Sequence, residues 1–105
     1  MDILIVEDDE SVARSFVRIL STSGHTVRHV ATVEEGLAAI RLPDFKADVL
    51  LLDRQVFGKD GWSLKEHAPP GVRVVLMTGE PPNDAPPHFL KGTHPSVLLS
   101  MISGD

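Results

Sequence analysis

Apolar residues follow two different patterns along this chain: continuous runs and helical spacing. Continuous apolar runs are typical of parallel strands that helices cover on both faces. Helical spacing instead marks the segment in which Val12, Phe16 and Leu20 recur. We predict five strands, at Ile3–Val6, Thr26–Val30, Ala47–Leu52, Val72–Met77 and Phe89–Leu90. We predict four helices, at Ser11–Leu20, from Thr32 toward Arg41, at Trp62–His67 and from Pro95 toward Ile102.

Residues that begin and end helices stand at the expected boundaries. Asp9 is expected to cap the first helix rather than to bind a metal, and Gly24 is placed to end it. Thr32 and Glu35 are spaced as a capping box that opens the second helix, which Pro43 terminates. These signals support the helices predicted from the spacing of apolar residues.

The alternation of strands and helices favours an α/β fold with a doubly wound parallel sheet. The chain has 105 residues and neither an internal repeat nor a recognisable linker, so residues 1–105 are predicted to form one domain. Hydrophobic residues make up 42% of the chain, which is ordinary for a globular domain.

Charge and composition exclude some function classes. The net charge of −5 does not favour contact with nucleic-acid phosphates, so no direct nucleic-acid partner is expected. There is no Cys, no stretch long enough to span a membrane and no basic, apolar leader at Met1. We therefore expect a cytoplasmic protein without a membrane partner.

Polar side chains stand at the carboxyl ends of four predicted strands. Glu7 and Asp8 follow the first strand, and Asp53, Thr78 and Lys91 follow the third, fourth and fifth. Open α/β sheets bind ligands at this edge, because the carboxyl ends of parallel strands meet there. We therefore expect these five residues to lie close together.

Gathered carboxylates repel one another unless a cation lies among them. Because Mg²⁺ keeps several waters and takes only one or two carboxylates, we expect Asp8 and Asp53 as direct ligands and Glu7 as a ligand through water. A carboxylate also serves as a nucleophile that carries an acyl phosphate, and Asp53 is the candidate. The phosphoryl charge would be neutralised by the metal, the Lys91 ammonium and the Thr78 hydroxyl.

These residues resemble the receiver domain of bacterial two-component response regulators. The resemblance rests on segments that keep the family's order and together cover nearly the whole chain. They are Ile3–Asp9, Val49–Asp53 with Asp60-Gly61 downstream, Val75–Gly79 and Phe89–Lys91. The resemblance implies a flavodoxin-like, five-stranded sheet of strand order 2-1-3-4-5.

The resemblance also implies a role for each residue of the site. Glu7 and Asp8 would be the acidic pair and Asp53 the phosphoacceptor. Thr78 would be the switch hydroxyl, and Lys91 the lysine that contacts the phosphate. Each motif alone is weak, but five positions in order at strand ends form a strong combined signal.

Further consequences follow from the resemblance alone. The carbonyl of Gln55 would be another metal ligand. The function would be Mg²⁺-dependent phosphorylation on Asp53 by a histidine kinase or a histidine phosphotransfer protein, followed by phosphorylation-dependent binding of a partner. Such a domain is not an enzyme beyond forming and hydrolysing its own acyl phosphate.

The sequence departs from the family's pattern at several places. Only twelve residues separate Thr78 from Lys91, while an average helix alone takes about 11 to 12, so the helix between strands 4 and 5 is expected to be absent or very short. Gly92 stands where proline with a cis bond is usual, and we expect a trans bond here. Phe57 stands where the family tends to have proline.

Two other functions stay open at this point. One is a receiver-like docking module that acts without phosphorylation. The other is a phosphatase of the haloacid dehalogenase type, which the order of the motifs and the lack of room for a substrate cap oppose. The cognate kinase, the downstream partner, the pathway, the oligomeric state and any attachment to a larger protein do not follow from these residues.

Overall fold

The computed structural model of the chain describes residues 1–79 and 88–103. Within them, the centre of the fold is a five-stranded parallel sheet of order β2-β1-β3-β6-β7. Its strands are β1 (Asp2–Val6), β2 (Thr26–Val30), β3 (Val49–Asp53), β6 (Arg73–Thr78) and β7 (His88–Leu90). Counted along the chain, this is the predicted order 2-1-3-4-5, so the doubly wound α/β fold is confirmed.

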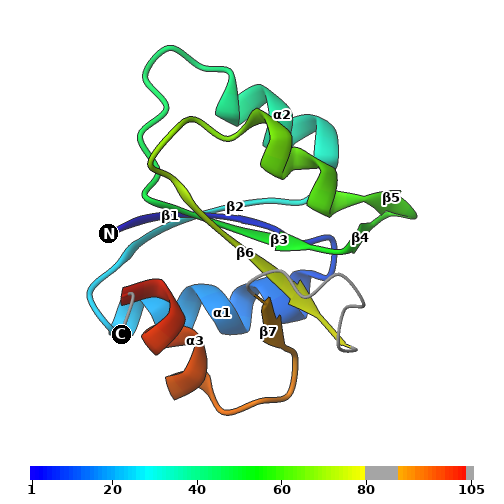
Figure 1. Ribbon diagram of the computed structural model, residues 1–105. Coiled ribbons are helices and arrows are strands. Elements are labelled where there is room, and N and C mark those ends of the chain that lie inside the picture. The colour runs from blue at the N-terminus through cyan, green and yellow to red at the C-terminus, as the bar shows by residue number, and fades with distance from the viewer. Residues whose placement is uncertain (80–87, 104–105) are drawn as a thin grey trace.

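Helices cover both faces of the sheet (Figure 1). On one face lie α1 (Glu10–Thr22) and α3 (Pro95–Ser103). The other face carries α2 (Val33–Ile40) and the 3₁₀-helix η1 (Gly61–His67). Successive residues of one strand enter opposite cores: Leu51 packs beneath α1 and α3, whereas Leu50 and Leu52 pack beneath α2 and η1. This two-sided burial explains the continuous apolar runs.

Hydrogen bonds confirm the predicted caps at Asp9 and Thr32, and α1 begins one residue before and ends two residues after the predicted helix. The Asp9 carboxylate accepts from the backbone N–H groups of Ser11 and Val12 at 2.9 and 3.1 Å, which caps α1. Gly24 follows α1 with φ of 93°, a backbone that glycine adopts without a steric penalty. The Thr32 hydroxyl accepts from Glu35 N at 3.0 Å and opens α2.

A short hairpin follows β3, where the sequence predicts only a loop. Its strands are β4 (Gln55–Val56) and β5 (Lys59–Asp60), paired antiparallel. Phe57 and Gly58 form the connection with φ of 50° and 77°. Strands of two residues are too short to show a period, and Phe-Gly is a weaker hairpin signal than Asn-Gly, so the pattern did not reveal this element.

Two expectations concern the chain between β6 and α3. The shortened fourth helix falls on residues 80–87, which lie outside the described part of the chain. The trans bond between Lys91 and Gly92 is confirmed, because the described residues contain no cis peptide. None of the described helices has the length and apolar character needed to cross a membrane.

Candidate functional site at the carboxyl edge of the sheet

The parallel strands carry the predicted residues to one edge of the sheet. Asp53 and Thr78 are the last residues of β3 and β6, and Glu7 directly follows β1. Lys91 directly follows β7, and its N–H donates to the Thr78 carbonyl over 2.8 Å. This edge and the β4–β5 hairpin lie on the right in Figure 1.

Lys91 links two carboxylates at this edge. Its Nζ lies 2.8 Å from Glu7 Oε1 and 3.2 Å from Asp53 Oδ2. The Glu7 side chain is 0% exposed and that of Lys91 is 27% exposed, so solvent screens this ion pair far less than a surface pair. The single ammonium therefore partly balances both acids.

Three carboxylates come close enough to share a cation. Glu7, Asp8 and Asp53 each offer one oxygen, and these oxygens lie within 4.8 Å of one another. Oε2 of Glu7 is buried and has no hydrogen-bond partner among the described residues. A buried oxygen without a partner is costly, and all-oxygen donors are the ligands of hard divalent ions. The cluster therefore fits a divalent cation.

The surroundings of Glu7 disfavour the charged form of its carboxyl group. Burial, together with the neighbouring Asp53 carboxyl, raises the pKa of Glu7 from its ordinary 4.5 to about 8, although Lys91 acts in the opposite direction. Burial lowers the pKa of Lys91, but its hydrogen bond to Glu7 and the charges of Glu7 and Asp53 outweigh burial and raise that pKa overall. Without a cation, one lysine does not offset the negative charge.

The hairpin contributes a contact that sequence reasoning missed. The Phe57 backbone N–H donates to Asp8 Oδ2 over 2.8 Å. These residues are 49 positions apart, and a backbone amide carries no residue-type signal. The Gly58 that follows Phe57 marked a turn, but nothing in the pattern indicated what the turn contacts.

Thr78 and Gln55 border an open depression next to Asp53. The depression measures about 360 Å³ and is lined by Asp53, Arg54, Gln55, Thr78 and Gly79. It gives solvent access to the end of β3, where Asp53 is 8% exposed. Gln55 lies in β4, two residues after Asp53, so its carbonyl as a metal ligand stays a prediction.

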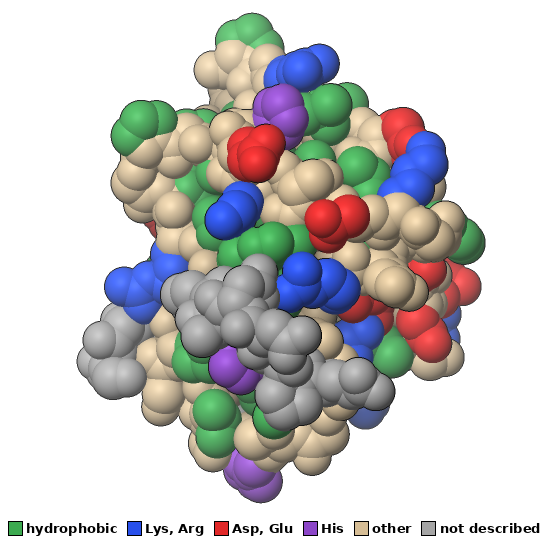
Figure 2. All heavy atoms as spheres, turned by 45° about the vertical axis from the view of Figure 1, so that its right-hand side comes forward, with side chains coloured by type: hydrophobic (Ala, Val, Ile, Leu, Met, Phe, Trp, Pro, Cys, Tyr) green, Lys and Arg blue, Asp and Glu red, His purple; other side chains and the backbone are tan. Residues whose placement is uncertain are grey.

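The surface around this edge is mixed in charge with an acidic side. Figure 2 turns the edge toward the viewer, and acidic side chains gather on the right half of the visible face. Lys and Arg side chains lie among them. A phosphoryl group approaching this face therefore meets both signs of charge.

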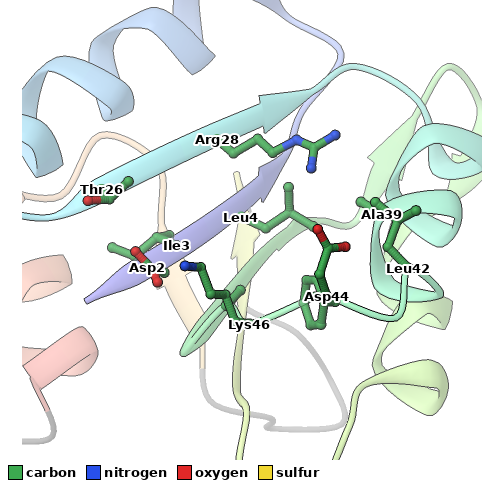
Figure 3. A pocket seen from close by; sticks show the side chains of 11 residues that line it. Asp2, Ile3, Leu4, Thr26, Arg28, Ala39, Leu42, Asp44 and Lys46 are labelled. Carbon is green, nitrogen blue, oxygen red and sulfur yellow. The ribbon is translucent and has the colours of Figure 1, made fainter.

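A separate pocket of about 270 Å³ lies at the amino ends of β1 and β2 (Figure 3). Its floor includes Leu4, and its charged lining residues are Asp2, Arg28, Asp44 and Lys46. Because two acids face two bases, the lining does not favour a ligand of one charge. The pocket lies at the opposite end of the strands from Asp53.

Neither models of known protein families nor curated proteins match the sequence. Solved structures do match. A CheY-like response regulator receiver domain protein from Methanospirillum hungatei JF-1 is 30% identical with a TM-score of 0.87, over 98% of this chain and 90% of that one. The BeF3-activated N-terminal receiver domain of Klebsiella pneumoniae RstA is 26% identical with a TM-score of 0.82, over 98% and 96%.

A third structure supports the fold alone. It is a response regulator protein from Burkholderia pseudomallei with a phosphorylated aspartic acid, calcium ion and citrate. It is 21% identical with a TM-score of 0.80, over 96% of this chain and 65% of that one.

The 30% identity to the Methanospirillum protein, over nearly the full length of both chains, decides the family. The chain belongs to the receiver domains of two-component response regulators.

Proposed function

We propose that this chain is a phosphoacceptor that takes a phosphoryl group on Asp53 in a Mg²⁺-dependent reaction. One observation carries the proposal: Lys91 Nζ lies 3.2 Å from Asp53 Oδ2, beside carboxylate oxygens that fit a divalent cation. The acceptor lines an open depression, and a cation for the phosphoryl oxygens and the candidate metal site both lie beside the acceptor. The proposed ligands of the metal are Glu7, Asp8, Asp53 and the carbonyl of Gln55.

The reaction is a displacement at phosphorus. An Asp53 carboxylate oxygen forms a bond to the phosphorus of a phosphohistidine, the phosphorus–nitrogen bond breaks, and the departing imidazole keeps the electron pair and takes up a proton. Lys91 binds a phosphoryl oxygen, and the Thr78 hydroxyl donates a hydrogen bond to another. Bound Mg²⁺ supplies positive charge that offsets the phosphoryl oxygens.

The donor is a histidine kinase or a histidine phosphotransfer protein, and the phosphorylated form binds a downstream partner. Two structural neighbours support phosphorylation of an aspartate, though they name no donor: the Burkholderia protein carries a phosphorylated aspartic acid with a calcium ion, and the Klebsiella receiver domain is BeF3-activated. The only turnover we propose is formation and hydrolysis of the protein's own acyl phosphate.

Intact-mass spectrometry after incubation with MgCl₂ and acetyl phosphate tests the proposal. Wild type is expected to gain the mass of one phosphate, and Asp53→Asn is expected to gain none. Asp48→Asn is the matched control, because Asp48 lies at the opposite end of β3. Beryllofluoride binding, followed in parallel by NMR, detects the site even if the acyl phosphate hydrolyses quickly. A phosphate that persists in Asp53→Asn, or no response to either reagent, contradicts the proposal.

A further inference from the structure

The β4–β5 hairpin holds a backbone amide against one proposed metal ligand. The Phe57 N–H donates to Asp8 Oδ2 over 2.8 Å, and this hydrogen bond joins the hairpin to the segment after β1. Asp9, the next residue, turns its carboxylate away to cap α1. The Asp8 carboxylate therefore accepts from the hairpin, whereas the Asp9 carboxylate accepts from the first turn of α1.

The backbone of Phe57 is unusual for a residue that carries a side chain. Its φ of 50° lies in the left-handed region, and Gly58 follows with φ of 77°. Two such residues suit a tight hairpin, in which Asn-Gly is common and phenylalanine is not. The Phe57 ring is 66% exposed, so burial of the ring does not account for this conformation. The two-residue turn between Val56 and Lys59 does, and it leaves the Phe57 N–H free to donate to Asp8.

The hairpin is attached to the site at its other end as well. Gly61 N donates to the Arg54 carbonyl over 3.0 Å, and a Cβ atom on Gly61 would lie 2.1 Å from the Asp53 carbonyl oxygen. The Val56 side chain is 1% exposed and packs in the core beneath α2. The Phe57 amide is therefore held in a fixed place relative to Asp53.

We infer that the Phe57 N–H is a positioning group for the metal site, an inference that rests on the proposed function. It orients the Asp8 carboxylate toward Glu7 and Asp53 before the cation binds. Hydrogen bonds to ligating groups commonly set metal affinity in this way. A proline at this position would have no N–H to donate, so the contact depends on the residue that stands here.

An amide-to-ester replacement at Phe57 tests this role. The α-hydroxy acid analogue of phenylalanine keeps the ring and the backbone path and puts an ester oxygen in place of the N–H. The Kd for Mg²⁺, from an NMR titration with MgCl₂, is expected to rise about 10- to 100-fold. At saturating Mg²⁺ the phosphorylation rate with acetyl phosphate is expected to match wild type, because Asp8 is then held by the metal.

Phe57→Gly is the matched control, because it keeps the N–H and tolerates a positive φ. Its Kd for Mg²⁺ is expected to stay close to that of wild type. An ester variant that binds Mg²⁺ like wild type overturns the inference. Equal weakening in the ester and in Phe57→Gly also overturns it, because Phe57→Gly keeps the N–H, and a loss common to both variants would come from a changed hairpin conformation.

Asp8→Asn separates this inference from the proposed function. If Asp8→Asn leaves Mg²⁺ affinity unchanged, the proposed metal site is wrong; if it weakens binding and the ester does not, only the role of Phe57 fails. A measurement on the metal-free protein avoids changing Phe57. Hydrogen exchange of the Phe57 amide should be slow in wild type and faster in Asp8→Ala, and equal rates contradict the contact.

Discussion

At the residue scale, Glu7 carries an electrostatic cost at the carboxyl edge of the sheet. Its carboxyl is buried next to Asp53, and its pKa is raised to about 8. The folded protein therefore keeps a proton that the unfolded chain releases near pH 4.5. The free energy of unfolding should fall as pH rises from about 4.5 to 8, and this loss is complete above pH 8.

Glu7→Gln should remove this loss, because the amide keeps the shape of the side chain without its charge. In EDTA, we expect the variant to be more stable than wild type at pH 8.5 and closer to it at pH 6. A gain of about 1 kcal/mol would raise the Tm by about 4–8 °C in a domain of this size. Thermal unfolding followed by circular dichroism measures the difference.

Glu10→Gln is the control for that comparison, because Glu10 is an exposed acid in the first turn of α1. Its effect on the Tm should not change between pH 6 and 8.5. If Glu7→Gln shows the same lack of pH dependence, the buried Glu7 carboxyl is not the source of the pH-dependent loss of stability.

Lys91 is the second residue whose position predicts a measurable effect. Lys91→Met removes the ammonium that lies 3.2 Å from Asp53 Oδ2. Because a positioned charge that stabilises a transition state typically accounts for a factor of about 10²–10³, we expect phosphorylation by acetyl phosphate to slow by about that factor. Lys46→Met, at the opposite edge of the sheet, should react like wild type. Similar rates in all three proteins would show that Lys91 does not act on the phosphoryl group.

At the element scale, the join between β3, the hairpin and η1 depends on Gly61. The Asp60 carboxylate caps η1 by accepting from Trp62 N over 3.0 Å, and the chain then passes directly over the Asp53 carbonyl. A side chain does not fit between these two backbones. This explains a glycine at the start of a helical turn without invoking flexibility.

Gly61→Ala should therefore destabilise the protein by overpacking. Its Cβ would lie 2.1 Å from the Asp53 carbonyl oxygen and 2.9 Å from Val56 Cγ2. We expect a loss of about 1–3 kcal/mol in the free energy of unfolding, measured by urea denaturation. Gly79→Ala is the control, because its Cβ would meet no atom of the described residues within 4 Å. Equal stabilities of the two variants would contradict this packing.

The two faces of the sheet are covered by helices of different length and type. One face is covered by α1 and α3, which have 13 and 9 residues, whereas the other carries α2 with 8 residues and the 3₁₀-helix η1 with 7. Phe16 of α1 packs edge-on against Phe89 of β7, with ring centroids 5.9 Å apart. This contact connects the helix that Asp9 caps to the strand that precedes Lys91.

At the scale of the whole molecule, the acidic edge couples cation binding to folding. A cation that binds only the folded state stabilises it by about 2.7 kcal/mol at a concentration 100 times its Kd. Mg²⁺ should therefore raise the Tm of wild type, and the rise should grow with concentration. Calorimetry in EDTA and in increasing MgCl₂ measures this dependence.

Asp8→Asn should lose most of that rise, because it removes a proposed ligand. Asp44→Asn, in the pocket at the opposite edge, should keep it. A rise of equal size in all three proteins would mean that Mg²⁺ stabilises the chain elsewhere or through ionic strength alone.

Local sequence signals predicted most of the fold. Continuous apolar runs identified the strands, because both faces of this sheet are buried, and side-chain caps at Asp9 and Thr32 identified helix starts, because a cap acts within three residues. Those strand ends also located Glu7, Asp53, Thr78 and Lys91, since parallel strands present their carboxyl ends at one edge. The β4–β5 hairpin was not predicted, because strands of two residues are too short to show a period.

Only the tertiary structure decided how the residues at that edge interact. Lys91 pairs with Glu7 across 84 positions, and Phe57 donates to Asp8 across 49. Burial of Glu7, and with it the raised pKa, depends on helices and strands from the whole chain. The sequence by itself determined which chemical groups reach the edge, because that follows from local structure and strand direction. Distances, burial and hydrogen-bond partners were decided by packing, because each depends on atoms from segments far apart along the chain.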